Sequence, residues 1–130
     1  MVKVWTNGCF DVLHRGHIEM LKYAKSLGDE LVVGVDTDMK VKKDKGHHRP
    51  FNKLEDRIEI LLALRCVDRV ISFDSREKLE KSIEDYAPDY IVVGADWRGK
   101  DVVGSHYSKQ VCFFERVGDL STTKILGYLK

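Results

Sequence analysis

Two histidines lie either side of a glycine in the segment GCFDVLHRGHIEML, residues 8–21. His14 and His17 are three positions apart, at the point where a strand-like opening gives way to a helical pattern. Gly16 between them lets a ligand approach the backbone closely, because glycine has no Cβ. The free N–H groups at a helix start attract anions. Imidazole N–H donors beside those groups would complete a phosphate site and stabilise charge on a phosphoryl group.

A metal site and a purely structural role are the alternatives for these histidines. Metal binding needs more ligands, and Asp11 with His14 and His17 gives an Asp-x-x-His-x-x-His spacing that matches no familiar zinc arrangement. The helical HxxxH pair is absent from the sequence. The spacing therefore favours phosphate binding over incidental structural histidines, with metal binding third, and we assign no metal ligands.

Short apolar runs alternate with amphipathic stretches along the chain, as in β-strands followed by helices. We expect strands at residues 3–7, 30–36, 68–73, 89–94 and 109–114, and helices at residues 17–27, 52–65, 76–87 and 122–129. Asn52 followed by Glu55 is a helix-start pattern, and Ser121 would cap the last helix. Residues 38–52 are polar and basic and contain Pro50, so we expect a loop there.

This alternation predicts an α/β protein with one domain, residues 1–130. The expected architecture is a Rossmann-like, doubly wound parallel sheet of about five strands with helices on both faces. In such sheets, ligands bind beyond the carboxyl ends of the strands, where the strand order reverses. The histidine segment is one of the strand-to-helix turns at that edge.

Composition excludes several classes of protein. A net charge of +1 on 130 residues gives no overall attraction to nucleic acid or membrane, and we expect neither as a partner. Cys9, Cys66 and Cys112 are widely spaced and include no CxxC pair, which argues against a disulfide framework or a cysteine zinc site. The sequence has no signal-peptide pattern and no apolar run of about 18 residues. We therefore expect a cytoplasmic location.

Two motifs resemble the nucleotidyltransferase superfamily, in its small cytidylyltransferase-like branch. GCFDVLHRGH resembles the HxGH signature, and LSTTKI at residues 120–125 resembles an ISTTKI-type segment that holds nucleotide phosphates. The resemblance covers essentially the whole chain. It implies that an acceptor phosphate oxygen attacks the α-phosphorus of a nucleoside triphosphate and that pyrophosphate leaves. Catalysis then depends on positioning and charge neutralisation, normally with Mg²⁺.

The resemblance also implies roles for individual residues. It assigns catalysis to His14, His17, Lys45 and Arg57. Nucleotide binding is assigned to Gly8, Cys9, Phe10, Gly16, Asp96, Arg116, Ser121, Thr122 and Thr123. Acceptor binding is assigned to Asp11, Asp38 and Trp97.

Three of these assignments have alternatives. Lys42 and Lys43 are close enough to Lys45 to take the catalytic role. Arg57 could instead form a salt bridge on a helix surface. Cys9 could be a nucleophile, but nothing in the sequence pairs it with a base, so we expect a small residue at a strand end.

The substrates are suggested by two groups of relatives. TNGCFD, KGHHRPFNKLEDR and ALRCVDRVISF resemble the heptose 1-phosphate adenylyltransferase domain of lipopolysaccharide synthesis. GADWRGK, with Arg116 before Ser121, resembles glycerol-3-phosphate cytidylyltransferase. Because the later strand-to-helix turns hold the nucleobase in this family, we favour CTP and a small polyol or sugar phosphate such as glycerol 3-phosphate. ATP with heptose 1-phosphate is the alternative.

Two further expectations concern activity and assembly. A nucleotide-binding regulator without catalysis is the alternative from another functional class, and the intact motifs argue against it. The resemblance also implies a homodimer.

Overall fold

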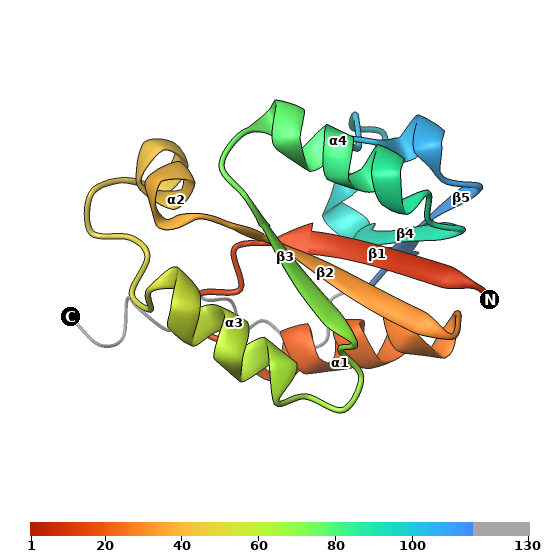
Figure 1. The fold of residues 1–130 in the computed structure, drawn as a ribbon, viewed down its shortest axis with the longest axis horizontal. Helices are drawn as coiled ribbons and strands as arrows, with labels where there is room; N and C mark the ends of the chain where they lie inside the picture. The colour runs from red at the N-terminus through yellow and green to blue at the C-terminus, as the bar shows by residue number, and fades with distance from the viewer. Residues whose placement is uncertain (116–130) are drawn as a thin grey trace.

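A five-stranded, fully parallel sheet forms the centre of the protein in the computed structural model, which describes residues 1–115. The strands are β1 (Lys3–Gly8), β2 (Glu30–Asp36), β3 (Arg69–Phe73), β4 (Tyr90–Gly94) and β5 (Gln110–Phe114). The helices are α1 (Arg15–Ser26), α2 (Asp38–Lys45), α3 (Leu54–Leu62) and α4 (Arg76–Tyr86), with short 3₁₀ turns η1 (Ala95–Trp97) and η2 (Ser105–Tyr107). Figure 1 shows α1 and α3 on one face of the sheet and α4 on the other.

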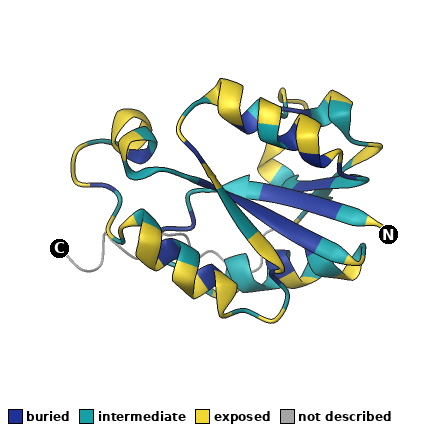
Figure 2. Ribbon diagram, viewed as in Figure 1, coloured by how far each residue is buried: buried dark blue, intermediate teal, exposed yellow. Residues whose placement is uncertain are grey.

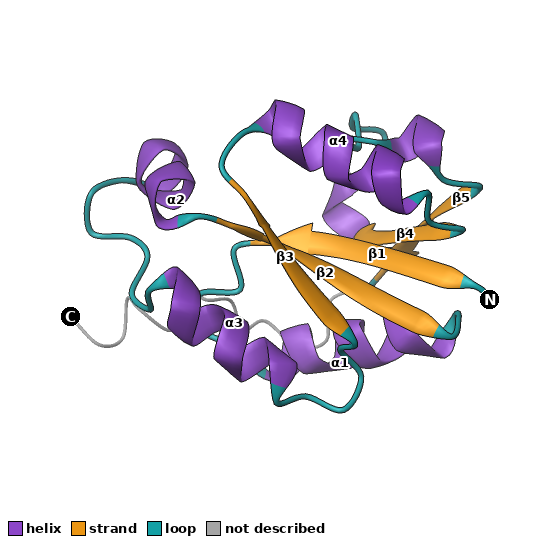
Figure 3. Cartoon of the chain, viewed as in Figure 1, coloured by secondary structure: helices purple, strands orange, loops and turns teal. Residues whose placement is uncertain are grey.

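The strand order β3-β2-β1-β4-β5 confirms the predicted doubly wound topology. The chain builds outward from β1 through β2 to β3 and then crosses to the other side of β1 to add β4 and β5. The order therefore reverses between β1 and β4, which is the predicted location for a ligand site. Figure 3 shows β1 in the sheet with β2 and β3 on one side of it and β4 and β5 on the other.

Helices cover both faces because the central strands are apolar on both sides. In β2, residues 31–35 are all buried, as expected for a strand inside a parallel sheet. Alternate residues of β1 enter different cores: Val4 packs with α1 and α3, whereas Trp5 packs with α4. Figure 2 shows the resulting buried centre between two exposed helical layers. Gly34 is needed opposite Trp5, because a Cβ there would lie 2.5 Å from the indole ring.

The prediction of a loop over residues 38–52 is wrong for its first half, which forms α2. Thr37 caps this helix by accepting a hydrogen bond from the N–H of Lys40. Val41 is its one buried residue. With no apolar stripe, the sequence has no helical period that could reveal the helix. Figure 1 shows α2 beyond the carboxyl end of β2.

Two helix starts also differ from the prediction. α1 begins at Arg15, two residues before the predicted start, because His14 caps the helix. α3 begins at Leu54 after an N-cap at Lys53 that makes no side-chain capping bond. The predicted last helix, with Ser121 before it, lies outside the described residues. No helix within residues 1–115 is long and apolar enough to cross a membrane.

Candidate functional site

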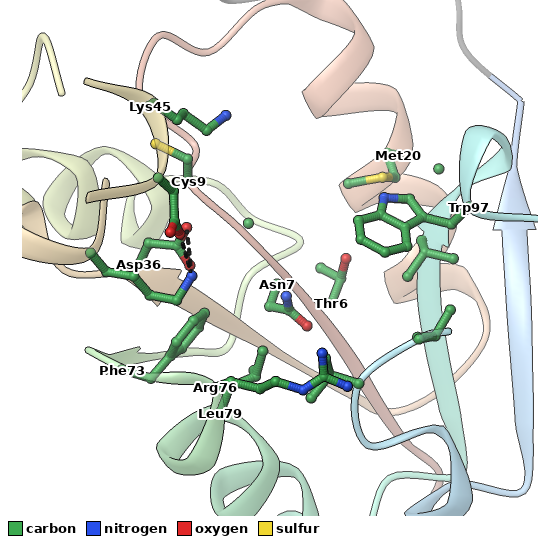
Figure 4. A pocket seen from close by; sticks show the side chains of 17 residues that line it. Thr6, Asn7, Cys9, Met20, Asp36, Lys45, Phe73, Arg76, Leu79 and Trp97 are labelled. Carbon is green, nitrogen blue, oxygen red and sulfur yellow. Dashed lines mark hydrogen bonds and ion pairs between the residues drawn. The ribbon is translucent and has the colours of Figure 1, made fainter. Parts of the chain in front are cut away.

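A cavity of about 460 Å³ opens beyond the carboxyl ends of the strands, at the reversal between β1 and β4 (Figure 4). β1 and β4 pair only through Val4 with Tyr90 and Trp5 with Ile91, so the two strands separate beyond Trp5. The Thr6 hydroxyl then donates a hydrogen bond to the Val92 carbonyl at 2.8 Å. The sheet topology therefore creates the cavity by ending the ladder between these two strands early.

The walls of this cavity differ in chemistry from one end to the other. Polar and charged side chains include Asn7, Asp36, Lys40, Asp44, Lys45 and Arg76. Apolar side chains include Met20, Phe73, Leu79, Trp97, Val102 and Val103. In Figure 4, Asp36 and Lys45 lie at one end of the cavity, and Met20 and Trp97 lie at the other. A ligand with a charged part and an apolar part fits this division.

The two motif histidines are adjacent at the start of α1, as the phosphate-binding hypothesis requires. Nδ1 of His14 accepts a hydrogen bond from the N–H of Gly16 at 3.0 Å, and Nδ1 of His17 accepts one from the N–H of His14 at 3.2 Å. The two ring centroids are 4.0 Å apart. A neutral imidazole that accepts at Nδ1 carries its proton on Nε2. The capping bonds therefore select the tautomer that makes each Nε2–H a donor.

Gly8, Cys9 and Phe10 link β1 to this helix start. Gly8 and Cys9 line the cavity. Phe10 is buried in a left-handed conformation with φ of 49°. Its ring lies 5.6 Å from the His17 ring and would be 3.3 Å from a Cβ at Gly8. Phe10 thus packs against the histidine turn. Direct contact of Gly8 and Cys9 with a nucleotide stays a prediction.

Arg57 lies in the protein interior with 0% of its surface exposed, so the helix-surface salt bridge is excluded. Its guanidinium donates to the carbonyls of Asn52, Cys9 and Asp36 and to the carboxylate of Asp38, at 2.7–3.0 Å. These bonds tie together the β1–α1 turn, the end of β2 and the starts of α2 and α3. The described contacts give Arg57 a positioning role, in contrast to the phosphate contact that the resemblance implied.

Asp11, expected to bind the acceptor, is also buried and holds a neighbouring loop in place. Its carboxylate accepts hydrogen bonds from Arg49 Nε at 3.1 Å and from the N–H groups of Phe51 and Asn52 at 2.7 and 2.8 Å. The Asn52 side chain donates to the Asp11 carbonyl. Asp38 has a similar anchoring function, because it accepts from Arg57 and from the N–H of Leu54. Neither carboxylate lines the cavity.

Of the remaining residues with an assigned role, some line the cavity and others do not. All three lysines are exposed, but Lys45 lines the cavity and Lys42 and Lys43 do not, so the structure favours Lys45 among them. Trp97 lines the apolar end, and the neighbouring Asp96 is exposed in η1. Four assigned residues lie outside the described part of the chain: Arg116, Ser121, Thr122 and Thr123.

Lys40 and Arg76 line the cavity and were not anticipated from the sequence. Arg76 opens α4 directly after β3, and its guanidinium is 2.9 Å from the Asp101 carboxylate in an exposed ion pair. Lys40 lies in the first turn of α2, four residues after Asp36 at the end of β2. The rule that ligands bind beyond strand ends could have identified both residues, because each closely follows a strand.

Burial raises the pKa of two titratable groups that line the cavity, Asp36 and Cys9. Burial raises the pKa of the Asp36 carboxyl, and Lys40 opposes this effect. Burial likewise raises the pKa of the Cys9 thiol, against the influence of Arg57 and Lys45. A raised pKa leaves less thiolate at neutral pH, which is the opposite of what a nucleophilic cysteine needs.

Cys9 should therefore react slowly with iodoacetamide at pH 7, more slowly than free cysteine, because the thiol form dominates in the folded protein. The rate should increase as the pH rises through the thiol pKa. Mass spectrometry of the Cys9 peptide after timed labelling measures the rate at pH 7 and at higher pH. Fast labelling at pH 7 would contradict this assignment and revive the nucleophile hypothesis.

Within residues 1–115, no three His, Cys, Asp or Glu side chains are arranged to hold a metal ion. Mg²⁺ usually keeps several waters and takes one or two carboxylates together with substrate phosphates. The Mg²⁺ that the family resemblance implies therefore stays a prediction.

Comparison with known proteins gives consistent matches. Residues 5–125 match the model of the cytidylyltransferase-like family. The bifunctional protein HldE of Campylobacter fetus is 47% identical over 98% of this chain, and that of Helicobacter pylori is 43% identical over the same share. The aligned region covers 28% and 27% of those proteins, so the chain spans about a quarter of the length of these relatives.

A solved structure agrees with the sequence matches. The lipopolysaccharide core biosynthesis protein of Thermoplasma volcanium superposes with a TM-score of 0.70 and 30% identity. The superposition covers 93% of this chain and 99% of that one. Pantoate-beta-alanine ligase of Francisella tularensis shares the fold at 17% identity, with a TM-score of 0.58.

Proposed function

Because the chain belongs to the cytidylyltransferase-like family of nucleotidyltransferases, we propose that it transfers adenylate from ATP to heptose 1-phosphate and releases pyrophosphate. An oxygen of the acceptor phosphate attacks the α-phosphorus, and the bond from that phosphorus to the pyrophosphate oxygen breaks. No covalent enzyme intermediate is needed. This agrees with a cavity that offers cations and N–H donors and a cysteine that is held protonated.

The observation that carries the choice of substrates is the 47% identity to an HldE protein along 98% of the chain. HldE contains the heptose 1-phosphate adenylyltransferase domain that the first three-fifths of the sequence resembles. The initial preference for CTP and glycerol 3-phosphate depended on short motifs near Trp97 and Arg116. We now favour ATP and heptose 1-phosphate over that pair, because the identity to HldE proteins extends through the region that contains those motifs.

The described residues suggest how the reaction is supported. His14 and His17 would donate from Nε2 to phosphate oxygens at the start of α1, where the helix dipole favours an anion. Lys45, which lines the cavity, would neutralise phosphate charge. Arg57 and Asp11 would keep these surrounding segments in place. A bound Mg²⁺ would neutralise charge on the triphosphate.

A homodimer remains part of this proposal. Ile60 and Leu62 on α3 are exposed apolar side chains, 43% and 51% accessible. Their burial against a second copy would be favourable.

Pyrophosphate release from four substrate pairs tests the proposal directly. ATP and CTP are each combined with heptose 1-phosphate and with glycerol 3-phosphate in the presence of Mg²⁺. We expect release with ATP and heptose 1-phosphate, at a rate well above the other three pairs. Release with CTP and glycerol 3-phosphate instead would restore the first preference. Nucleotide binding without release from any pair would favour the non-catalytic regulator.

A further inference from the structure

Asp36 differs from the other well-shielded carboxylates of the protein because no hydrogen bond from residues 1–115 reaches its side chain. The Asp36 side chain is only 14% exposed, and its one ion pair with residues 1–115 is with Lys40 Nζ at 3.8 Å. By contrast, the fully buried Asp11 carboxylate accepts three hydrogen bonds, and even the Asp38 carboxylate, 36% exposed, accepts two. Well-shielded polar groups in proteins are normally hydrogen-bonded. Asp36 thus presents two acceptor oxygens to the cavity without local donors.

Lys40 cannot supply the missing bonds because it is held elsewhere. Its Nζ lies 2.8 Å from the Asp44 carboxylate, one turn further along α2, and 5.8 Å from the centre of the Phe73 ring. Asp44 therefore takes the hydrogen bond from the ammonium group, which remains within ion-pair distance of Asp36 without bonding to it. Figure 4 shows the Asp36 side chain at the charged end of the cavity, near Cys9 and Lys45.

The two ends of the cavity suit different parts of the reacting pair. The apolar end, with Met20 and Trp97, fits a nucleobase. Gly8 and Cys9, which lead from β1 to the histidine turn, also line the cavity, and we place the reacting phosphates at that turn. The charged end, beyond β2, is then left for the acceptor.

A phosphate group cannot be the partner of Asp36 itself, since two anions in contact repel each other. Hydroxyl groups are the suitable donors, because a carboxylate accepts strong charge-assisted hydrogen bonds from them. The acceptor phosphate has a cation nearby in Lys45, which forms no ion pair with other residues of the 1–115 segment. Arg76 is a second cation, held by Asp101 in a solvent-exposed pair of the kind that is easily exchanged.

We propose that Asp36 determines specificity for the acceptor by accepting hydrogen bonds from hydroxyl groups of a polyhydroxylated phosphate ester. This inference rests on the proposed transfer reaction and adds the group that reads the acceptor. Its substrate class is a sugar phosphate whose hydroxyls reach the end of β2 while the phosphate faces Lys45 and the histidine turn.

The test is calorimetric titration of the intact chain and its Asp36→Ala and Asp36→Asn variants with heptose 1-phosphate, inorganic phosphate and ATP separately. We expect Asp36→Ala to weaken heptose 1-phosphate binding about tenfold or more, as for a lost hydrogen bond to a charged group. Asp36→Asn should lose less, because its amide oxygen still accepts. Affinity for inorganic phosphate and ATP should not fall in either variant.

If Asp36 acted only by electrostatic repulsion, its removal would strengthen heptose 1-phosphate binding instead of weakening it, so the titration distinguishes the two roles. Removing a negative charge would strengthen the binding of every phosphorylated ligand, and equally so in the two Asp36 variants. Asp74→Ala is the matched control, since it removes one negative charge from a carboxylate that pairs with Lys78 and does not line the cavity. It should not weaken heptose 1-phosphate binding.

Three results would overturn the inference. The first is unchanged or tighter heptose 1-phosphate binding in Asp36→Ala. The second is a selective loss of ATP affinity, which would assign Asp36 to the ribose. The third is failure of wild-type protein to bind either heptose 1-phosphate or glycerol 3-phosphate while it binds ATP. Acceptor binding that depends on Asp36 but produces no pyrophosphate would instead reject the proposed reaction and support the role of Asp36.

Discussion

His17→Ala should lower turnover by at least about 10²-fold, the scale of one lost donor that stabilises transition-state charge. The variant removes the Nε2–H donor that the capping geometry provides at the start of α1. It also removes the capping bond to the N–H of His14, which costs about 1 kcal/mol of stability. Steady-state pyrophosphate release and urea denaturation measure the two effects.

His17→Glu separates catalysis from capping. Glutamate at this third helical position accepts the same backbone bond in a capping box, and its negative charge suits the helix start. It has no N–H donor and would repel phosphates. Stability should therefore return to about the wild-type value while turnover stays at or below that of His17→Ala. A near-normal rate in His17→Ala would remove the phosphate-binding hypothesis for this histidine.

Arg57→Lys should lower the free energy of unfolding by about 3–5 kcal/mol, the usual cost of disrupting a buried charged network. Lysine keeps the charge but cannot reproduce the planar fork that bonds to three carbonyls and Asp38. Chemical denaturation measures the loss. Turnover should also fall, because the β1–α1 turn and the end of β2 lose their common anchor.

The exposed Arg65 provides the matched control for this prediction. Arg65→Lys changes the same chemical group at the surface and should alter stability by less than about 0.5 kcal/mol. If Arg57→Lys kept wild-type stability but lost activity, Arg57 would act on substrate, as the family resemblance implied. If Arg57→Lys loses stability and Arg65→Lys does not, the result supports the positioning role of Arg57.

The main features of the fold follow from local patterns that the sequence displays. The apolar run ELVVGVD forms β2 at the predicted bounds, and the parallel, doubly wound order follows from strands that alternate with amphipathic helices. α2 escaped prediction because a helix stabilised by a Thr37 cap and ion pairs from Lys40 to Asp36 and Asp44 shows no apolar period.

The sequence by itself determined the topology and the His14–Gly16–His17 turn, because these depend on hydrophobic period and on residues close together in the chain. The tertiary structure decided which polar residues face the cavity. Arg57 and Asp11 look like surface or ligand-binding groups in sequence, yet their bonds reach 48 and 41 residues away and bury them. Lys40 and Arg76 look ordinary in sequence, yet both line one cavity. The reason is physical: burial and hydrogen-bond partners depend on which distant segments pack together.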